Sequence, residues 1–158
     1  MRRRLICKRN FGNVVDITDP CYDRDVWCRM NNVPIKSGEY HCIKWLNTDK
    51  GELDGKPYAD TRVGILGIYL DGVIPQQKQM VEIGSIGVDA GLAGFFENKP
   101  DYNDNEWQEF CDRLGKNKNA WAIDCGVYSS SGYGDGCYGV YAYKNPSNDI
   151  VALEIRFM

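Results

Sequence analysis

The stretch RVGILGIYL, Arg62 to Leu70, is apolar on both of its alternating sets of positions. A strand covered on both faces has this pattern, whereas a half-buried strand alternates apolar with polar residues. The Asp71-Gly72 pair that follows it is typical of a turn. We therefore expect this stretch to be the central strand of a sheet, around which the other elements are arranged.

Alternating patterns predict further strands on both sides of this central stretch. They occur at residues 39–46 before it, and at 121–128, 137–143 and 149–157 after it. Residues 47–58 carry Gly51, Gly55 and Pro57 among charges, and we expect them to form a surface loop. Together the patterns predict a mostly antiparallel sheet or sandwich.

Two helices are expected beside these strands. Residues 103–115 begin with a capping-box-like N-x-x-E sequence, continue with apolar residues three and four positions apart, and end at Gly115. Asp23 is a candidate N-cap for a short helix near 23–31. The predicted fold class is therefore β-rich α+β with one main helix, and a length of 158 residues predicts a single globular domain, 1–158.

Composition excludes several classes of function. The net charge of -3 offers no basic surface for a nucleic-acid backbone, so we expect no nucleic-acid polymer as a partner. No run approaches the roughly 18 apolar residues of a membrane helix, and no apolar signal region follows the first four residues. The sequence thus predicts a cytoplasmic protein that does not bind membranes.

The seven cysteines do not form a recognisable pattern. Their odd number and the absence of a C-x-x-C pair argue against a disulfide framework and against a thiolate zinc site. We expect most of them to be small buried apolar residues. His41 is the only histidine, and in an alternating strand it is expected to be a packed or surface residue, although a Cys–His nucleophilic pair is arithmetically possible.

The segment SSSGYGDGCYGVYAY, Ser129 to Tyr143, surrounds Asp135 with glycines. Backbone N–H groups of such a loop can bind an anion, but the Lys and Ser/Thr of a phosphate-binding P-loop are absent. The competing interpretation is a distorted start of a strand that needs positive φ, which glycine adopts without strain. Tyr133 and Tyr138 can stack on a planar ligand, or they can be half-buried sheet residues.

Three aspartates, Asp19, Asp89 and Asp135, each lie in a turn-like segment next to Gly or Pro or one residue from it. Carboxylates brought together by loops can ligate a hard cation or divide into acid and base roles. Equally, an Asp in such a segment commonly bonds its own backbone in an Asx-turn. A divalent cation is therefore possible, but no metal ligand and no other cofactor are predicted.

Three segments together resemble a family of bacterial and phage-encoded proteins catalogued as domain-of-unknown-function family 4241. They are VDITDPCY (15–22), IGVDAGLAGFF (86–96) and the SSSGYGDGCYGVYAY segment. The resemblance spans most of the chain, and the third segment is its most specific part. It implies that the three segments contribute to one site, and it brings no established activity.

We predict that the chain is a non-enzymatic binding module for a small ligand, which can be nucleotide-like or anionic, or for a protein partner. If it is phage-encoded, sequestering a host signalling nucleotide is one version of this role. The alternatives are a carboxylate-based, metal-dependent or metal-free hydrolase that uses Asp19, Asp89 and Asp135, and a structural or interaction protein. The predicted ligand-binding residues are Asp19, Tyr22, Asp89, Ser131, Tyr133, Gly134, Asp135 and Tyr138.

Overall fold

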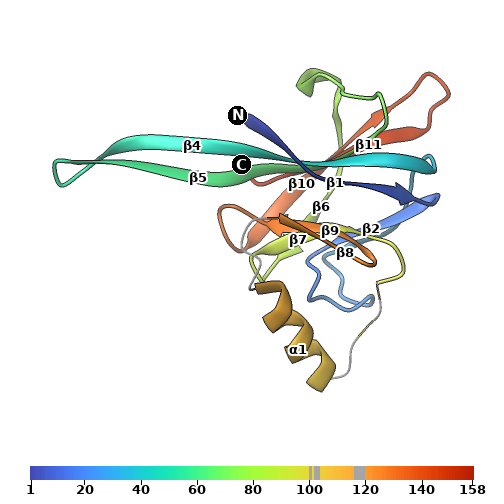
Figure 1. Cartoon of the computed structure of the whole chain (residues 1–158). Helices are drawn as coiled ribbons and strands as arrows, with labels where there is room; N and C mark the ends of the chain where they lie inside the picture. The colour runs from blue at the N-terminus through green and yellow to red at the C-terminus, as the bar shows by residue number, and fades with distance from the viewer. Residues whose placement is uncertain (100, 102–103, 116–119) are drawn as a thin grey trace.

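The computed structural model describes the chain except for residues 100, 102–103 and 116–119 (Figure 1). The predicted central stretch forms the second half of strand β5 (Lys56–Leu70), which pairs with one neighbour on each side. Leu66 and Ile68 face the core, while Ile65 and Tyr69, on the opposite face, are also buried. The prediction of a central strand covered on both faces is confirmed.

The described strands form two antiparallel sheets, so the predicted β-rich and mostly antiparallel architecture is confirmed. The first sheet has the order β1 (Arg2–Phe11), β4 (Gly38–Leu53), β5, β11 (Ile150–Arg156), β10 (Gly136–Lys144) and β6 (Val81–Val88). The second has the order β3 (Met30–Pro34), β2 (Val14–Thr18), β7 (Leu92–Phe96), β9 (Gly126–Ser130) and β8 (Ala120–Ile123). A short 3-10 helix, η1 (Gln77–Gln79), precedes β6.

The main core lies between the two sheets. Leu66, Val140 and Leu153 of the first sheet pack in the same cluster as Ile17 and Phe95 of the second. All five side chains are buried, and apolar area removed from water in this way is the main favourable contribution to folding. The sheets are thereby fixed face to face, which leaves the outer face of the second sheet for another element.

Helix α1 (Asp104–Gly115) lies against that outer face (Figure 1). Its Phe110 is buried in a second cluster with Phe96 and Tyr128 of the sheet. A helix therefore forms where one was expected, but in a chain that is otherwise almost entirely strands and turns the α+β class is not supported. The predicted cap at Asn103 and the side chains of Trp107 and Leu114 lie outside the described part of the chain.

The short helix predicted near 23–31 is wrong. Residues 20–29 form turns, and Met30 already belongs to β3. The Arg29 side chain is buried and bonds to the Tyr22 carbonyl at 2.8 Å and to the Asp16 carboxylate at 3.2 Å. These bonds to separate places along the chain hold the segment as a loop, in which the Trp27 side chain is 92% exposed.

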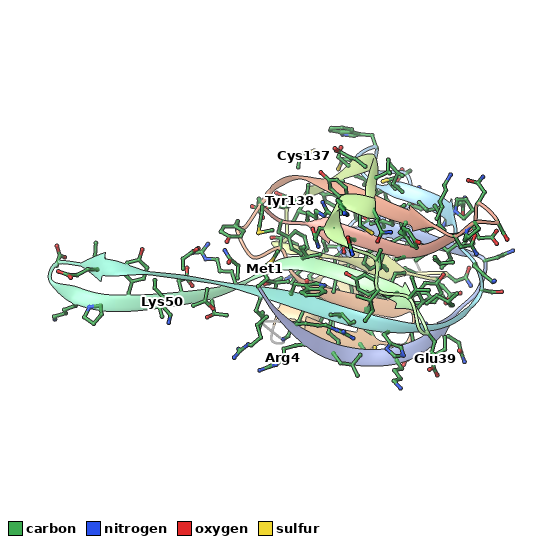
Figure 2. The ribbon with its side chains drawn as sticks, turned by 90° about the horizontal axis from the view of Figure 1, so that it is seen from above. Met1, Arg4, Glu39, Lys50, Cys137 and Tyr138 are labelled. Atoms are coloured by element: carbon green, nitrogen blue, oxygen red, sulfur yellow. The ribbon has the colours of Figure 1, made fainter. Side chains whose placement is uncertain are left out.

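The surface loop expected at 47–58 is also wrong. Strands β4 and β5 stay paired from Leu46↔Val63 to Leu53↔Lys56 and form a two-stranded arm that projects from the body, with Lys50 far along it (Figures 1 and 2). We call residues 48–61 the β4–β5 arm. A two-residue turn at its tip places Asp54 and Gly55 at φ of 51° and 73°, which Asp-Gly adopts readily in hairpins.

Candidate functional site

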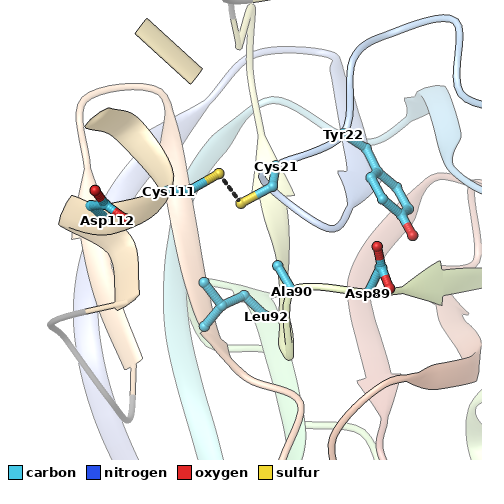
Figure 3. Close-up of a pocket in the computed structure, with 7 residues that line it drawn as sticks. All are labelled: Cys21, Tyr22, Asp89, Ala90, Leu92, Cys111 and Asp112. Atoms are coloured by element: carbon cyan, nitrogen blue, oxygen red, sulfur yellow. Dashed lines mark hydrogen bonds between the residues drawn. The ribbon is translucent and has the colours of Figure 1, made fainter. Parts of the chain in front are cut away.

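A pocket of about 310 Å³ lies where the 19–29 loop, the turn after β6 and helix α1 meet (Figure 3). We call it the loop–helix pocket. Tyr22 and Asp89, two of the predicted ligand-binding residues, line it, and Asp19 lies next to it with no exposed surface. The lining consists of Cys21, Tyr22, Asp89, Ala90, Leu92, Cys111 and Asp112.

Asp19 joins two of the three sequence segments. One carboxylate oxygen accepts the Cys21 backbone N–H at 2.9 Å, which is an Asx-turn, and the other accepts those of Asp89 at 2.9 Å and Ala90 at 2.7 Å. Burial raises the pKa of this carboxyl, and the three N–H donors, which favour the charged form, offset part of that rise. Asp19 therefore holds the pocket wall in position and is not itself part of the lining.

The 19–29 loop is fixed by a second set of polar contacts centred on Asp16 of β2. Its carboxylate binds Arg24 at 2.8 Å and Arg29 at 3.2 Å and accepts the Asn32 backbone N–H at 2.8 Å. The Asp16 carboxylate and the Arg29 guanidinium are both almost fully buried, so each removes the penalty of an unpaired buried charge on the other. Tyr22 and Cys21 are thus presented by a firmly anchored loop.

Two thiols face each other at one side of the pocket. Cys21 Sγ and Cys111 Sγ lie 2.7 Å apart, and burial raises the pKa of both. Because a thiolate is the nucleophilic form of cysteine, neither is activated for nucleophilic catalysis. The other five cysteines, which also lie in the described part of the chain, are free thiols: Cys7, Cys28, Cys42, Cys125 and Cys137.

The opposite side of the pocket is acidic and aromatic. Burial raises the pKa of the Tyr22 hydroxyl, and the neighbouring charges of Cys28, Asp19 and Asp89 raise it further, so Tyr22 stays a neutral hydrogen-bonding group. Asp89 supplies a carboxylate on this side, Asp112 supplies another beside Cys111 on α1, and Leu92 supplies apolar surface (Figure 3). Among the described residues that line the pocket, none is a lysine or an arginine.

The third segment lies beside the pocket but none of its residues lines it. Gly136 pairs with Val88, which places exposed Asp135 across from Asp89, and the Ser131 N–H donates to the Gly91 carbonyl at 2.9 Å. The three segments therefore meet along the backbone, while their three aspartates differ in role. Only Asp89 faces the pocket.

Tyr133, Gly134 and Tyr138 hold the loop to the body of the protein. Tyr133 accepts a hydrogen bond from Asn47 at 3.2 Å, and Tyr138 donates to the Gly134 carbonyl at 2.8 Å; the Ser131 hydroxyl donates to the same carbonyl. Gly132 and Gly134 have φ of 70° and 97°, so the expected positive φ is confirmed at these two glycines. A Cβ on Gly132 would meet the Val63 carbonyl at 2.0 Å, which explains why the loop needs glycine there.

Sequence reasoning missed five of the lining residues. Ala90 and Leu92 lie within the IGVDAGLAGFF segment (86–96), and their neighbour Asp89 was the available signal. Cys21 lies within the VDITDPCY segment (15–22), where its neighbour Tyr22 was the signal, whereas Cys111 and Asp112 become pocket residues because α1 packs on the second sheet. No pattern within the helix itself points to that contact.

Comparisons of the chain with family models, with curated proteins and with solved structures give no match. The resemblance to family 4241 therefore stays a prediction. Within the described residues, no helix has the length and apolar character needed to span a bilayer.

Proposed function

We propose that the protein is a non-enzymatic binding module that holds a small molecule in the loop–helix pocket. The observation that carries this proposal is a cavity of about 310 Å³ whose walls come from three separated segments. That volume is at the lower end for small-molecule sites, and apolar surface with a few placed polar groups is their usual lining. The Asp19 and Asp16 contacts keep two of the walls in place, so the pocket is formed before a ligand arrives.

The chemistry of the walls favours a ligand with a cationic group or hydrogen-bond donors. Asp89 and Asp112 accept but do not donate hydrogen bonds when ionised, and Tyr22 can do both. Because no described lining residue is a lysine or arginine, an anionic or nucleotide ligand would find no opposite charge in the lining. We therefore propose a small amine or guanidine-bearing molecule, and not the nucleotide-like or anionic kind of ligand that the sequence analysis included.

The positions of Asp19, Asp89 and Asp135 give less support to the hydrolase alternative. Asp19 has no exposed surface and is engaged by three backbone N–H groups, while Asp135 lies on the exposed loop beside the pocket. A shared cation would need ligand atoms that face one point. Sequestering a small molecule in the cytoplasm is the version of the binding role that we retain, and family 4241 is the membership that we propose.

Native mass spectrometry of protein purified from its own host tests the proposal. We expect a retained small molecule on the wild type and on Ala59→Trp, a control on the exposed arm, and none on Ala90→Trp, whose indole would fill the pocket. Retention by Ala90→Trp would move the site elsewhere. Bare wild-type protein would contradict a tightly held small molecule and favour a protein partner.

The charge of the ligand is tested separately by thermal shift. A panel of small primary amines should raise the unfolding temperature of the wild type more than a matched panel of carboxylic acids. Asp89→Asn should abolish the difference, whereas Asp49→Asn on the arm should keep it. Stabilisation by the acids alone would contradict the proposed ligand class.

A further inference from the structure

Three potential metal ligands meet on the first sheet, on the face turned away from the core. Glu39 and His41 are two residues apart on β4 and therefore share a face, and Asp71 directly follows β5. The Asp71 backbone N–H donates to the Glu39 carbonyl at 2.9 Å, which fixes the two strand ends together. One ligand atom from each side chain lies within 4.8 Å of the others.

One ring nitrogen of the histidine in this cluster forms no hydrogen bond with the part of the chain that the structure describes. Nε2 of His41 is shielded from solvent and lies 3.0 Å from Oδ1 of Asp71, but among the described residues it has no partner in hydrogen-bond geometry. Buried ring nitrogens normally have such a partner. Two donors that bind one ion at adjacent positions, each about 2.1 Å from it, are separated by about 3.0 Å at right angles and by about 3.4 Å in a tetrahedral site.

We propose that Glu39, His41 and Asp71 bind one first-row divalent transition-metal ion. An imidazole nitrogen with two carboxylate oxygens suits Zn²⁺, Co²⁺, Fe²⁺ or Mn²⁺, and the nitrogen separates this site from the oxygen-only sites that Mg²⁺ and Ca²⁺ prefer. Asp71 is 68% exposed, so water can reach the site. Three protein ligands leave at least one coordination position for that water.

The position of the cluster makes it independent of the loop–helix pocket. The pocket lies between the second sheet, the 19–29 loop and α1, whereas Glu39 lies at the end of the first sheet opposite to the β4–β5 arm (Figure 2). Strand β1 adds Lys8, which pairs with His41, and Asn10, which pairs with Glu39. Paired residues share a face, so Lys8 is the nearest positive charge that the register places beside the proposed ion.

Titration of the full chain with Co²⁺ tests the site by visible absorption. We expect saturable one-to-one binding with weak d–d bands and without thiolate-to-cobalt charge transfer, together with perturbed NMR signals of His41, the only histidine. His41→Gln and Asp71→Asn should each weaken binding at least about tenfold, because each removes a ligand. Glu52→Gln, an exposed carboxylate on the arm, is the matched control and should bind as the wild type does.

A variant that is expected to bind Co²⁺ more tightly distinguishes loss of a ligand from loss of folding, because a misfolded protein would not bind more tightly. Lys8→Met removes the neighbouring charge and should tighten Co²⁺ binding by about two- to fivefold at low salt. Charge-transfer bands would assign the ion to cysteines, and they would overturn the proposal. Equal binding by His41→Gln and the wild type, or no saturation at millimolar Co²⁺, would overturn it as well.

Discussion

At the scale of single residues, Cys7 is the thiol most prepared for reaction. A hydrogen bond with Cys42, its partner across β1 and β4, and the charge of Arg9 lower its pKa from 9.0 to about 7, although burial opposes them. We expect alkylation of Cys7 by iodoacetamide, followed by peptide mass spectrometry, to rise with pH around 7. In Cys42→Ala the rise should move toward 9.0, and a wild-type profile already centred there would contradict the assignment.

The buried Asp19 carboxyl makes the folding stability of the protein depend on pH. Burial raises its pKa in the folded protein above the ordinary 3.8. The folded state then holds this proton more tightly than the unfolded state does, so the associated stability is complete below pH 3.8 and is lost as pH rises through the folded pKa. Urea unfolding should show the wild type losing stability relative to Asp19→Asn over that interval. A constant difference between the two proteins would contradict the raised pKa.

At the scale of elements, the sequence predicts best where burial determines the pattern. The stretch from Arg62 to Leu70 is largely apolar because both faces of β5 are covered there. Burial of this kind can be recognised from the sequence alone. The same strand from Lys56 to Thr61 is solvated on both faces, so it has no alternation to detect. Only Asp54-Gly55 signalled a hairpin there, and glycine and proline among charges suggested a loop instead.

The 19–29 loop was mispredicted for a different reason. Its local pattern allows a capped helix, but the contacts that decide its shape reach Asp16, outside the segment. Buried ion pairs of this kind depend on which strands lie nearby. A window of ten residues cannot show which strands those are. Tertiary contacts thus overrode a weak local preference.

The β4–β5 arm is expected to fold without contributing to the stability of the body. None of the arm residues belongs to a buried core cluster, whereas Asn47 and Arg62 at its base hold the 131–134 loop. We expect replacement of residues 49–60 by Asn-Gly, which joins paired Thr48 and Thr61, to change the unfolding free energy by less than about 0.5 kcal/mol. Chemical denaturation measures this free energy, and a decrease of more than about 1 kcal/mol would contradict the expectation.

At the scale of the whole molecule, the sequence predicted only some of the residues that line the loop–helix pocket. Tyr22 and Asp89 were predicted because unusual turn segments are visible without a structure, and Asp135 was predicted for the same reason although it lies outside the pocket. The helix residues Cys111 and Asp112 depend on how α1 docks, which periodicity does not specify. The Glu39–His41–Asp71 cluster likewise depends on the β4–β5 register. That register brings Asp71, which directly follows β5, beside the start of β4.

The β4–β5 arm also makes the molecule elongated. Six residue steps from Asn47 to Leu53 carry the chain about 20 Å outward from a body that contains all of the described core. Such a molecule diffuses more slowly than a sphere of the same mass, and its X-ray scattering profile in solution should contain a sparse tail of long interatomic vectors. The arm tip, remote from the pocket and from the proposed metal ligands, is consequently a place to attach a fluorophore or a surface tether.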